Sequence, residues 1–287
     1  MKGTGLRSWL QGMACGLSQA YGTGHAWLGL AIAAALLVFQ PWMFAVCVYA
    51  ITLALLFAPR FERARFEQGL YLFNPFLFGC FAFAAFGPGL QAVVTVSVAV
   101  PAITVLALWL DSVGWRAYFT VPYIAAAHAS IVAFQRRLPA FPVIEPAQSG
   151  FLDGVVTSFA QVLLSADFRV GLAVLLAGLI VMPLPAIVAF AASALLSLAW
   201  LAIGLPASAA AAGLVGYNAV ILSFFVGKEL RTQMPGYLVA LVGGSAVHVV
   251  FHALDVAAYT FPFVVSGWLY LACRARARAA ALQGGSS

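Results

Sequence analysis

Three pairs of neutral polar residues recur at nearly constant spacing in the two halves of the chain, and they are the residues best placed to handle a solute. Amides offer both N–H donors and carbonyl acceptors, and hydroxyls do the same on a smaller scale. None of the six is ionisable, so an ion clamp or a proton relay is not indicated. The pairs are Gln19 with Gln161, Asn74 with Asn218, and Thr120 with Thr260.

Each threonine stands two residues before a proline, in Thr-Val-Pro at 120–122 and Thr-Phe-Pro at 260–262. A proline inside a helix has no N–H to donate, so Pro122 would release the carbonyl of Tyr118 and Pro262 that of Ala258. With the threonine hydroxyls on the same turn, each half would present a short row of acceptors to a solute rich in N–H groups. The alternative is a proline kink satisfied by a neighbouring helix or by the threonine itself.

The amide pairs also have a functional and a structural interpretation. Each asparagine follows an aromatic residue at the expected start of a short helix, where its side chain could cap free N–H groups or face a polar solute. The glutamines could guide an uncharged solute, or they could join helices inside the membrane. Recurrence in both halves favours the functional interpretation of the threonine element most.

The composition sets the environment that positions these residues. Of the 287 residues, 64% are hydrophobic and only 8% are charged, which is too few to cover a soluble domain of this size. A disordered chain and a nucleic-acid binder are excluded as well, because the basic residues that give a net charge of +6 fall in short clusters between long apolar runs. The chain is therefore predicted to be an integral membrane protein.

Breaks inside the uncharged runs predict where the helices end. A charge at the bilayer centre is costly, so uncharged runs of about 20 residues indicate spans. The run 8–59 is long enough for two spans and a short helix, with breaks near 21–24 and at Gln40-Pro41. Gly87-Pro88-Gly89 divides the run 68–110, which leaves a piece near 74–86 that is too short to cross and is predicted to be a re-entrant half-helix.

The second half repeats this arrangement, with a matching half-helix expected near 218–227. Blocks of similar residues recur in the same order at offsets of 140 to 144, which indicates a duplicated unit of about 140 residues. Five spans and a half-helix per unit force the second copy to enter from the opposite side. We therefore expect an all-α membrane protein of two inverted repeats around a central pore, as one structural domain. The expected parts are repeat 1–137, linker 138–152 and repeat 153–287.

The distribution of basic residues predicts the orientation. With ten spans both termini lie on one side, and loops on that side carry nine Lys and Arg against five on the other. The expected location is the inner (plasma) membrane, multi-pass, with both termini cytoplasmic. No signal peptide is recognised before the first apolar run.

One constellation points elsewhere. His248, His252 and Asp255 follow i, i+4, i+7 spacing and would share one helical face, which suits a metal ion. An intramembrane metal-dependent hydrolase is therefore one alternative function, and an ion-coupled secondary transporter of a small neutral or weakly basic solute is another. The absence of a zinc-protease motif and of an equivalent triad in the other half favours a polar helix face, so we expect no metal, no cofactor and no enzyme activity.

At these motifs the chain resembles the urea transporter family, over nearly its whole length and with both halves in order. The resemblance implies a homotrimer with one pore in each protomer, two inverted halves, and passive, channel-like permeation of urea or a closely related small amide. Urea and the lipid bilayer would be its partners, with no nucleic acid. The matching stretches are Gly16-Leu17-Ser18-Gln19, Gly69 to Asn74, Tyr118 to Tyr123, Gly213 to Asn218 and Tyr259 to Phe263.

The resemblance also implies roles for individual residues. One slot would be lined by Phe73, Leu77 and Val162, and the other by Tyr217, Ile221 and Ala20. The paired glutamines would hydrogen-bond the solute near these slots, and the paired threonines would flank the narrow middle. The chain departs from the family pattern at Gly22, which replaces an aromatic residue, and at Ala20, which replaces a larger aliphatic; these changes imply a wider slot.

Overall fold

The computed structural model describes residues 5–134 and 150–284, and every regular element in these ranges is helical. Most of the predicted linker lies outside the described residues, and α8 already begins at Phe151. The helices are α1 Leu6–Ser18, α2 Ala26–Phe39, α3 Pro41–Leu55, α4 Arg63–Glu67, α5 Phe73–Phe86, α6 Leu90–Ser112, α7 Val121–Ala133, α8 Phe151–Gln161, α9 Phe168–Val181, α10 Pro183–Ala202, α11 Ala207–Ala211, α12 Tyr217–Val226, α13 Met234–Ala253 and α14 Phe261–Gly284, with 3-10 turns η1 Gln19–Tyr21, η2 Ala58–Arg60 and η3 Gly227–Arg231.

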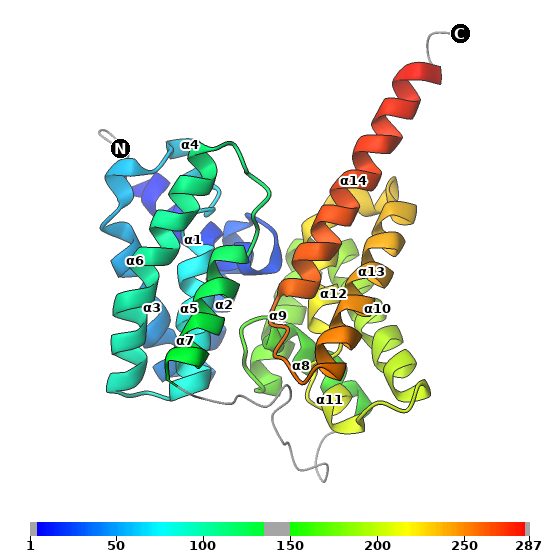
Figure 1. Cartoon of the computed structure of the whole chain (residues 1–287), viewed down its shortest axis with the longest axis horizontal. Helices are drawn as coiled ribbons and strands as arrows, with labels where there is room; N and C mark the ends of the chain where they lie inside the picture. Colours follow the sequence, from blue (N-terminus) through cyan, green and yellow to red (C-terminus); the bar gives the residue numbers. More distant parts are fainter. Residues whose placement is uncertain (1–4, 135–149, 285–287) are drawn as a thin grey trace.

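The helices form two sets that lie side by side, α1–α7 on the left of Figure 1 and α8–α14 on the right. Contacts join the sets in the middle, where α2 packs on α9, the short η1 contacts both α5 and α12, and α7 meets α14. The Tyr21 hydroxyl donates to the carbonyl of Phe159 at 2.5 Å, and the Trp268 indole donates to the carbonyl of Ala117 at 2.8 Å. Hydrogen bonds, one of them fully buried, therefore tie one set to the other.

The outer surface suits lipid. Large apolar side chains such as Trp27, Val98, Ile180 and Val242 are more than two-thirds exposed. Among the described residues, α6, α10 and α13 are each long and apolar enough to cross a membrane, and α1–η1 with α2 forms a fourth candidate bent by 81°. The helices α3, α5, α7 and α9 are apolar but shorter. Their shortness is compatible with elements that begin or end at membrane depth, where protein surrounds them.

The predicted helix breaks are confirmed. The chain leaves the helical conformation at 22–25, at Gln40, and at 87–89 between α5 and α6. Gly87 adopts a φ of 72°, which a residue with a Cβ rarely adopts, and this explains the sharp end of α5. The two predicted short helices are also found, as α5 and α12.

Glycines at matching positions allow helices to touch in both sets. A Cβ added at Gly29 of α2 would lie 1.7 Å from the carbonyl oxygen of Ala14, and one added at Gly171 of α9 would lie 2.4 Å from that of Val156. Both contacts join the first two long helices of their set. Without the glycines, neither pair could approach so closely.

A second matched pair of glycines precedes the two short helices. Gly69 has a φ of 80° and Gly213 a φ of 73°. A Cβ would lie 2.2 Å from the nitrogen of Gly16 at the first position and 2.5 Å from that of Ser158 at the second. Only glycine fits both the backbone conformation and the available space, so these turns fix where α5 and α12 begin.

Candidate functional site

The centre of the candidate site is built where α7 begins beside α5. The first backbone N–H groups of a helix lack partners within the helix, and in an apolar interior each needs another acceptor. Here Val121 N donates to the carbonyl of Tyr118 at 3.0 Å, Pro122 has no N–H, and Tyr123 N donates to Asn74 Oδ1 at 3.2 Å. Each N–H group of this first turn therefore has an acceptor, and Asn74 on α5 supplies the one for Tyr123.

The start of α14 repeats this bonding against α12. Phe261 N donates to the carbonyl of Ala258 at 3.0 Å, and Phe263 N donates to Asn218 Oδ1 at 3.1 Å, with Pro262 between them. Asn218 and Asn74 are both buried, at 7% and 1% exposure. Two helices that start inside the protein therefore receive the same unusual cap from the neighbouring short helix.

These bonds correct two predictions. Pro122 and Pro262 lie in the first turns of α7 and α14, and the carbonyls expected to be free, those of Tyr118 and Ala258, accept bonds from Val121 and Phe261. A proline in the first turn removes a donor that would otherwise need a partner, which is a better explanation than a kink.

The asparagines do not cap their own helices either. Leu72 and Gly216 hold the cap positions of α5 and α12, without side-chain cap bonds, and each asparagine lies in the first turn. The amides of Asn74 and Asn218 instead cap the neighbouring helix, which no pattern within one segment could predict.

A strained residue precedes each threonine. Phe119 has a φ of 46° and Tyr259 a φ of 43°, in the left-handed region that costs a non-glycine residue about 1–2 kcal/mol. The carbonyl of Phe119 accepts from Asn74 Nδ2 at 3.1 Å, and that of Tyr259 accepts from the Tyr217 hydroxyl. The strained corners are therefore anchored by α5 and α12, and they aim the next residue in a fixed direction.

That next residue is the threonine, and the two threonines meet. The hydroxyls of Thr120 and Thr260 lie 2.8 Å apart and are hydrogen-bonded to each other, and the residues are 2% and 3% exposed. Thr120 is the cap residue of α7, and Thr260 directly precedes α14. The structure thus brings together residues 140 positions apart at the junction of the two helix sets.

The paired glutamines make equivalent bonds. Gln19 Nε2 donates to the carbonyl of Gln68 at 2.9 Å, and Gln161 Nε2 donates to that of Ala212 at 2.8 Å. Both acceptors directly precede the glycine turns before α5 and α12. Each glutamine thus keeps its side-chain oxygen for another partner while its nitrogen supports the loop before a short helix.

The six apolar residues assigned to the slots are all nearly inaccessible in the described structure, with exposures from 0% to 6%. Ala20 lies in η1, which contacts both α5 and α12, while Val162 ends α8. The others lie on the short helices: Phe73 and Leu77 on α5, Tyr217 and Ile221 on α12.

The departure at Gly22 has a structural explanation. Gly22 adopts a φ of 74°, and a Cβ there would lie 2.7 Å from the Cβ of Phe225 on α12. The space beside Gly22 is therefore taken up by the neighbouring helix.

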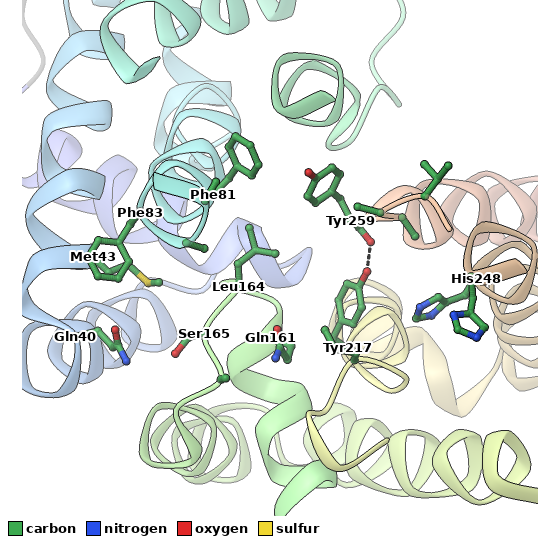
Figure 2. Close-up of a pocket in the computed structure, with 18 residues that line it drawn as sticks. Gln40, Met43, Phe81, Phe83, Gln161, Leu164, Ser165, Tyr217, His248 and Tyr259 are labelled. Atoms are coloured by element: carbon green, nitrogen blue, oxygen red, sulfur yellow. Dashed lines mark hydrogen bonds between the residues drawn. The ribbon is translucent and has the colours of Figure 1, made fainter. Parts of the chain in front are cut away.

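A cavity of about 390 Å³ lies at the α12 end of the site, and Figure 2 shows Gln161, Leu164, Tyr217 and Tyr259 around it. Of the residues predicted for the site, Gln161 and Tyr217 line it. Sequence reasoning missed most of the wall, although Leu164 and Tyr259 follow Gly22 and Phe119 at the repeat offsets and could have been found that way. The remaining lining residues are Gln40, Met43, Phe81, Phe83, Ala84, Ala85, Ser165, Ala166, Leu214, His248, His252, Val256, Ala257 and Ala258.

The expected face of His248, His252 and Asp255 is not formed. Helix α13 ends at Ala253, and Asp255 lies beyond it in an exposed turn with a φ of 52°. Both imidazoles pack on Trp200, with ring centroids 5.6 and 5.1 Å away. Within the described residues no three His, Cys, Asp or Glu side chains come together in a way that could hold a metal ion.

One comparison with known proteins identifies a family. The family model described as urea transporter matches residues 10–275, which include every residue assigned to the site. A search of curated protein sequences found no match.

Proposed function

The chain belongs to the urea transporter family, and we propose that urea crosses this multi-pass membrane protein passively, through a narrow path between α5, α12 and the starts of α7 and α14. Members of this family are transporters and not enzymes. The observation that carries the proposed path is the hydrogen-bonded pair of Thr120 and Thr260, because two uncharged hydroxyls meet at the junction of the helix sets.

The architecture we propose is two inverted repeats of five spans and one re-entrant half-helix, divided near residues 137 and 153. Its support is the recurrence of the same contacts at offsets of 140 to 144: the glycine turns, the glutamine bonds, the asparagine caps and the strained corners. We also propose a homotrimer in the inner membrane with cytoplasmic termini, which rests on the family resemblance and on the positions of Lys and Arg.

In the proposed path, urea first meets a slot with an aromatic wall, then the threonines, then the second slot. Urea is flat and neutral, with four N–H donors and one carbonyl, so it fits between apolar faces and bonds to oxygens at their edge. The first slot has Phe73, Leu77 and Val162, and the second has Tyr217, Ile221 and Ala20. The residues that we assign to the path are these six with Gln19, Asn74, Thr120, Gln161, Asn218 and Thr260.

The threonines set the barrier at the middle. Urea must separate the hydroxyls, which lie 2.8 Å apart, but it replaces their bond with bonds from its own N–H groups. An exchange of one neutral hydrogen bond for another changes the free energy by only about 1 kcal/mol. A hydrated ion would lose its water shell and gain no charged partner, so it would be excluded.

The test is urea flux into proteoliposomes, measured by stopped-flow light scattering after a urea gradient is imposed. Thr120→Val with Thr260→Val keeps the shape and removes both hydroxyls. We expect urea permeability to fall about tenfold, which is the effect of one lost hydrogen bond of about 1.4 kcal/mol at the barrier.

Thr104→Val is the matched control. Thr104 is equally buried, but among the described residues its hydroxyl bonds only to the carbonyl of Val100 in its own helix. Wild-type flux equal to that of protein-free vesicles would remove the proposed path. Equal flux in the double variant and the control would remove the threonines from it.

A further inference from the structure

The starts of α5 and α12 differ in the acceptor that is open to the side-chain N–H groups of the asparagine. Asn74 Nδ2 donates directly to the carbonyl of Phe119 at 3.1 Å. At the equivalent corner, the hydroxyl of Tyr217 donates to the carbonyl of Tyr259 in place of the asparagine. Figure 2 shows this bond at the edge of the large cavity. Phe73, which matches Tyr217, has no hydroxyl and cannot compete with Asn74 for the carbonyl of Phe119. In the second half, the Tyr217 hydroxyl does compete with Asn218 for the carbonyl of Tyr259.

The displaced amide is left beside a small cavity that has both polar and apolar lining residues. Asn218 Nδ2 lies near the Tyr217 hydroxyl, is inaccessible to solvent, and meets no acceptor with hydrogen-bond geometry among the described residues. A second cavity of about 10 Å³ is lined by Asn218, Ser245 and Ser266 together with apolar atoms and His248. A buried amide N–H without an acceptor is destabilising, so a partner is expected at this site.

We propose that this small cavity is a binding site for one ordered water molecule, which accepts from Asn218 Nδ2 and bonds to the hydroxyls of Ser245 and Ser266. A cavity of this size has room for one water, and three polar partners are the usual number for a buried one. The Ser245 hydroxyl already donates to the carbonyl of Leu241 at 2.8 Å, so it accepts from the water.

The first half lacks the means to hold such a water. Ser266 follows Thr260 by six residues, and the residue six positions after Thr120 is Ala126. Both changes, Tyr217 for phenylalanine and Ser266 for alanine, therefore occur in the same half and serve the same group. His248 lines both cavities, so the small cavity and the larger one both adjoin this side chain.

The direct test is a high-resolution map of the full-length protein. We expect a density peak within hydrogen-bond distance of Asn218 Nδ2 and Ser266 Oγ in the wild type. In Tyr217→Phe we expect the peak to be lost and Asn218 Nδ2 to donate to the carbonyl of Tyr259, as Asn74 does to Phe119. A wild-type map that shows other ordered waters but none here, or a direct bond from Asn218 to Tyr259, overturns the proposal.

A double-mutant cycle tests the same site without a map. Ser266→Ala removes one ligand of the water, so we expect a lower thermal unfolding midpoint in the wild-type background and less than half of that loss in Tyr217→Phe. Equal losses in the two backgrounds overturn the proposal. Ser130→Ala is the control, since Ser130 is buried in α7 and, within the described part of the chain, its hydroxyl bonds only to Ala126 of that helix. Neither readout depends on conduction, so it stands or falls separately from the proposed path for urea.

Discussion

The first turns of α7 and α14 have the same backbone bonds but different surroundings. In both, two N–H groups and one proline complete the turn, and an asparagine from a short helix supplies the outside acceptor. Around this frame, the α12 end has a cavity of about 390 Å³ and the hydroxyl of Tyr217. Backbone hydrogen bonding therefore constrains the first turns of α7 and α14 equally, whereas side chains that take no part in these bonds are free to differ.

The largest expected effect tests what the two ends share. Gly69→Val and Gly213→Val place a Cβ within about 2.5 Å of backbone atoms in a left-handed turn, so both variants should fail to yield folded protein. The measurement is the recovery of monodisperse protein by size-exclusion chromatography. Gly114→Ala is the control, since Gly114 has a φ of 79° but no atom within 4 Å of an added Cβ. If only one of Gly69→Val and Gly213→Val yields folded protein, the two turns are not equivalent.

The next prediction tests a feature found in the first half. Arg65 Nη2 lies 2.7 Å from Asp111 Oδ1, and the two side chains are only 12% and 13% exposed. Asp111→Asn leaves a buried guanidinium without its counter-charge, so we expect about 3–5 kcal/mol of destabilisation. Thermal unfolding in detergent measures it.

The matched control replaces the pair as a whole. Arg65→Met with Asp111→Leu should recover most of the stability, because no charge is then left uncompensated. A single variant as stable as the wild type would contradict a structural role for the pair.

The glutamines give a finer comparison of the two ends. Gln161 is 5% exposed, so Gln161→Leu leaves the carbonyl of Ala212 buried without its donor, at a cost of about 1–3 kcal/mol. Gln19 is partly exposed, and water can replace its bond to Gln68. We therefore expect Gln161→Leu to reduce urea flux and stability more than Gln19→Leu does, as measured in the proteoliposome assay and by thermal unfolding. The reverse order would show that the burial of each glutamine does not determine how much its replacement costs.

The smallest expected effect concerns the loops before α2 and α9. Asp167 caps α9 by accepting from Arg169 N at 2.9 Å, and hydrogen bonds from Arg169 lower the pKa of this carboxyl. His25, at the matching position before α2, makes no side-chain cap bond. Because the folded pKa is lowered, the stabilisation is present above the ordinary pKa of aspartate and is lost as pH falls through the folded value.

The measurement is the unfolding midpoint of Asp167→Ala relative to wild type. We expect a deficit of about 0.5–2 kcal/mol at pH 7 that shrinks on acidification below pH 4. His25→Ala removes no side-chain cap bond, so it should cost less at pH 7 than Asp167→Ala does. A deficit in Asp167→Ala that is independent of pH would assign the effect to packing.

Much of the fold could be predicted because glycine, proline and charge act locally. Gly87 and the Gln40-Pro41 break end helices through their own backbone preferences, so sequence alone located them. The threonine pair was also found, because two copies of one motif pointed to it. The role of Asn74 could not be predicted, because its partners Phe119 and Tyr123 lie 45 and 49 residues away in sequence. The role of Pro122 was mispredicted because α7 begins only at Val121, so the proline lies in a first turn and not inside a helix.

The cavity wall could not be predicted from motifs. His248 and His252 were grouped with Asp255 by helical spacing, but the helix ends at Ala253 and separates them from the carboxylate. Where a helix of 20 residues stops depends on the packing of α13 against α14, which periodicity does not contain. Leu164 and Tyr259 lie at the repeat offsets from Gly22 and Phe119, so the repeat predicts them whereas the histidine spacing does not.

Two hydroxyl groups that face each other cannot both give their hydrogen to the same bond. Thr260 donates here and Thr120 accepts, so the Thr120 oxygen keeps one lone pair and the Thr260 oxygen keeps two. Three acceptor sites and the single Thr120 O–H are left for other partners. On the path proposed above, the pair would therefore accept from N–H groups at more sites than it could donate from, which suits a solute with more donors than acceptors.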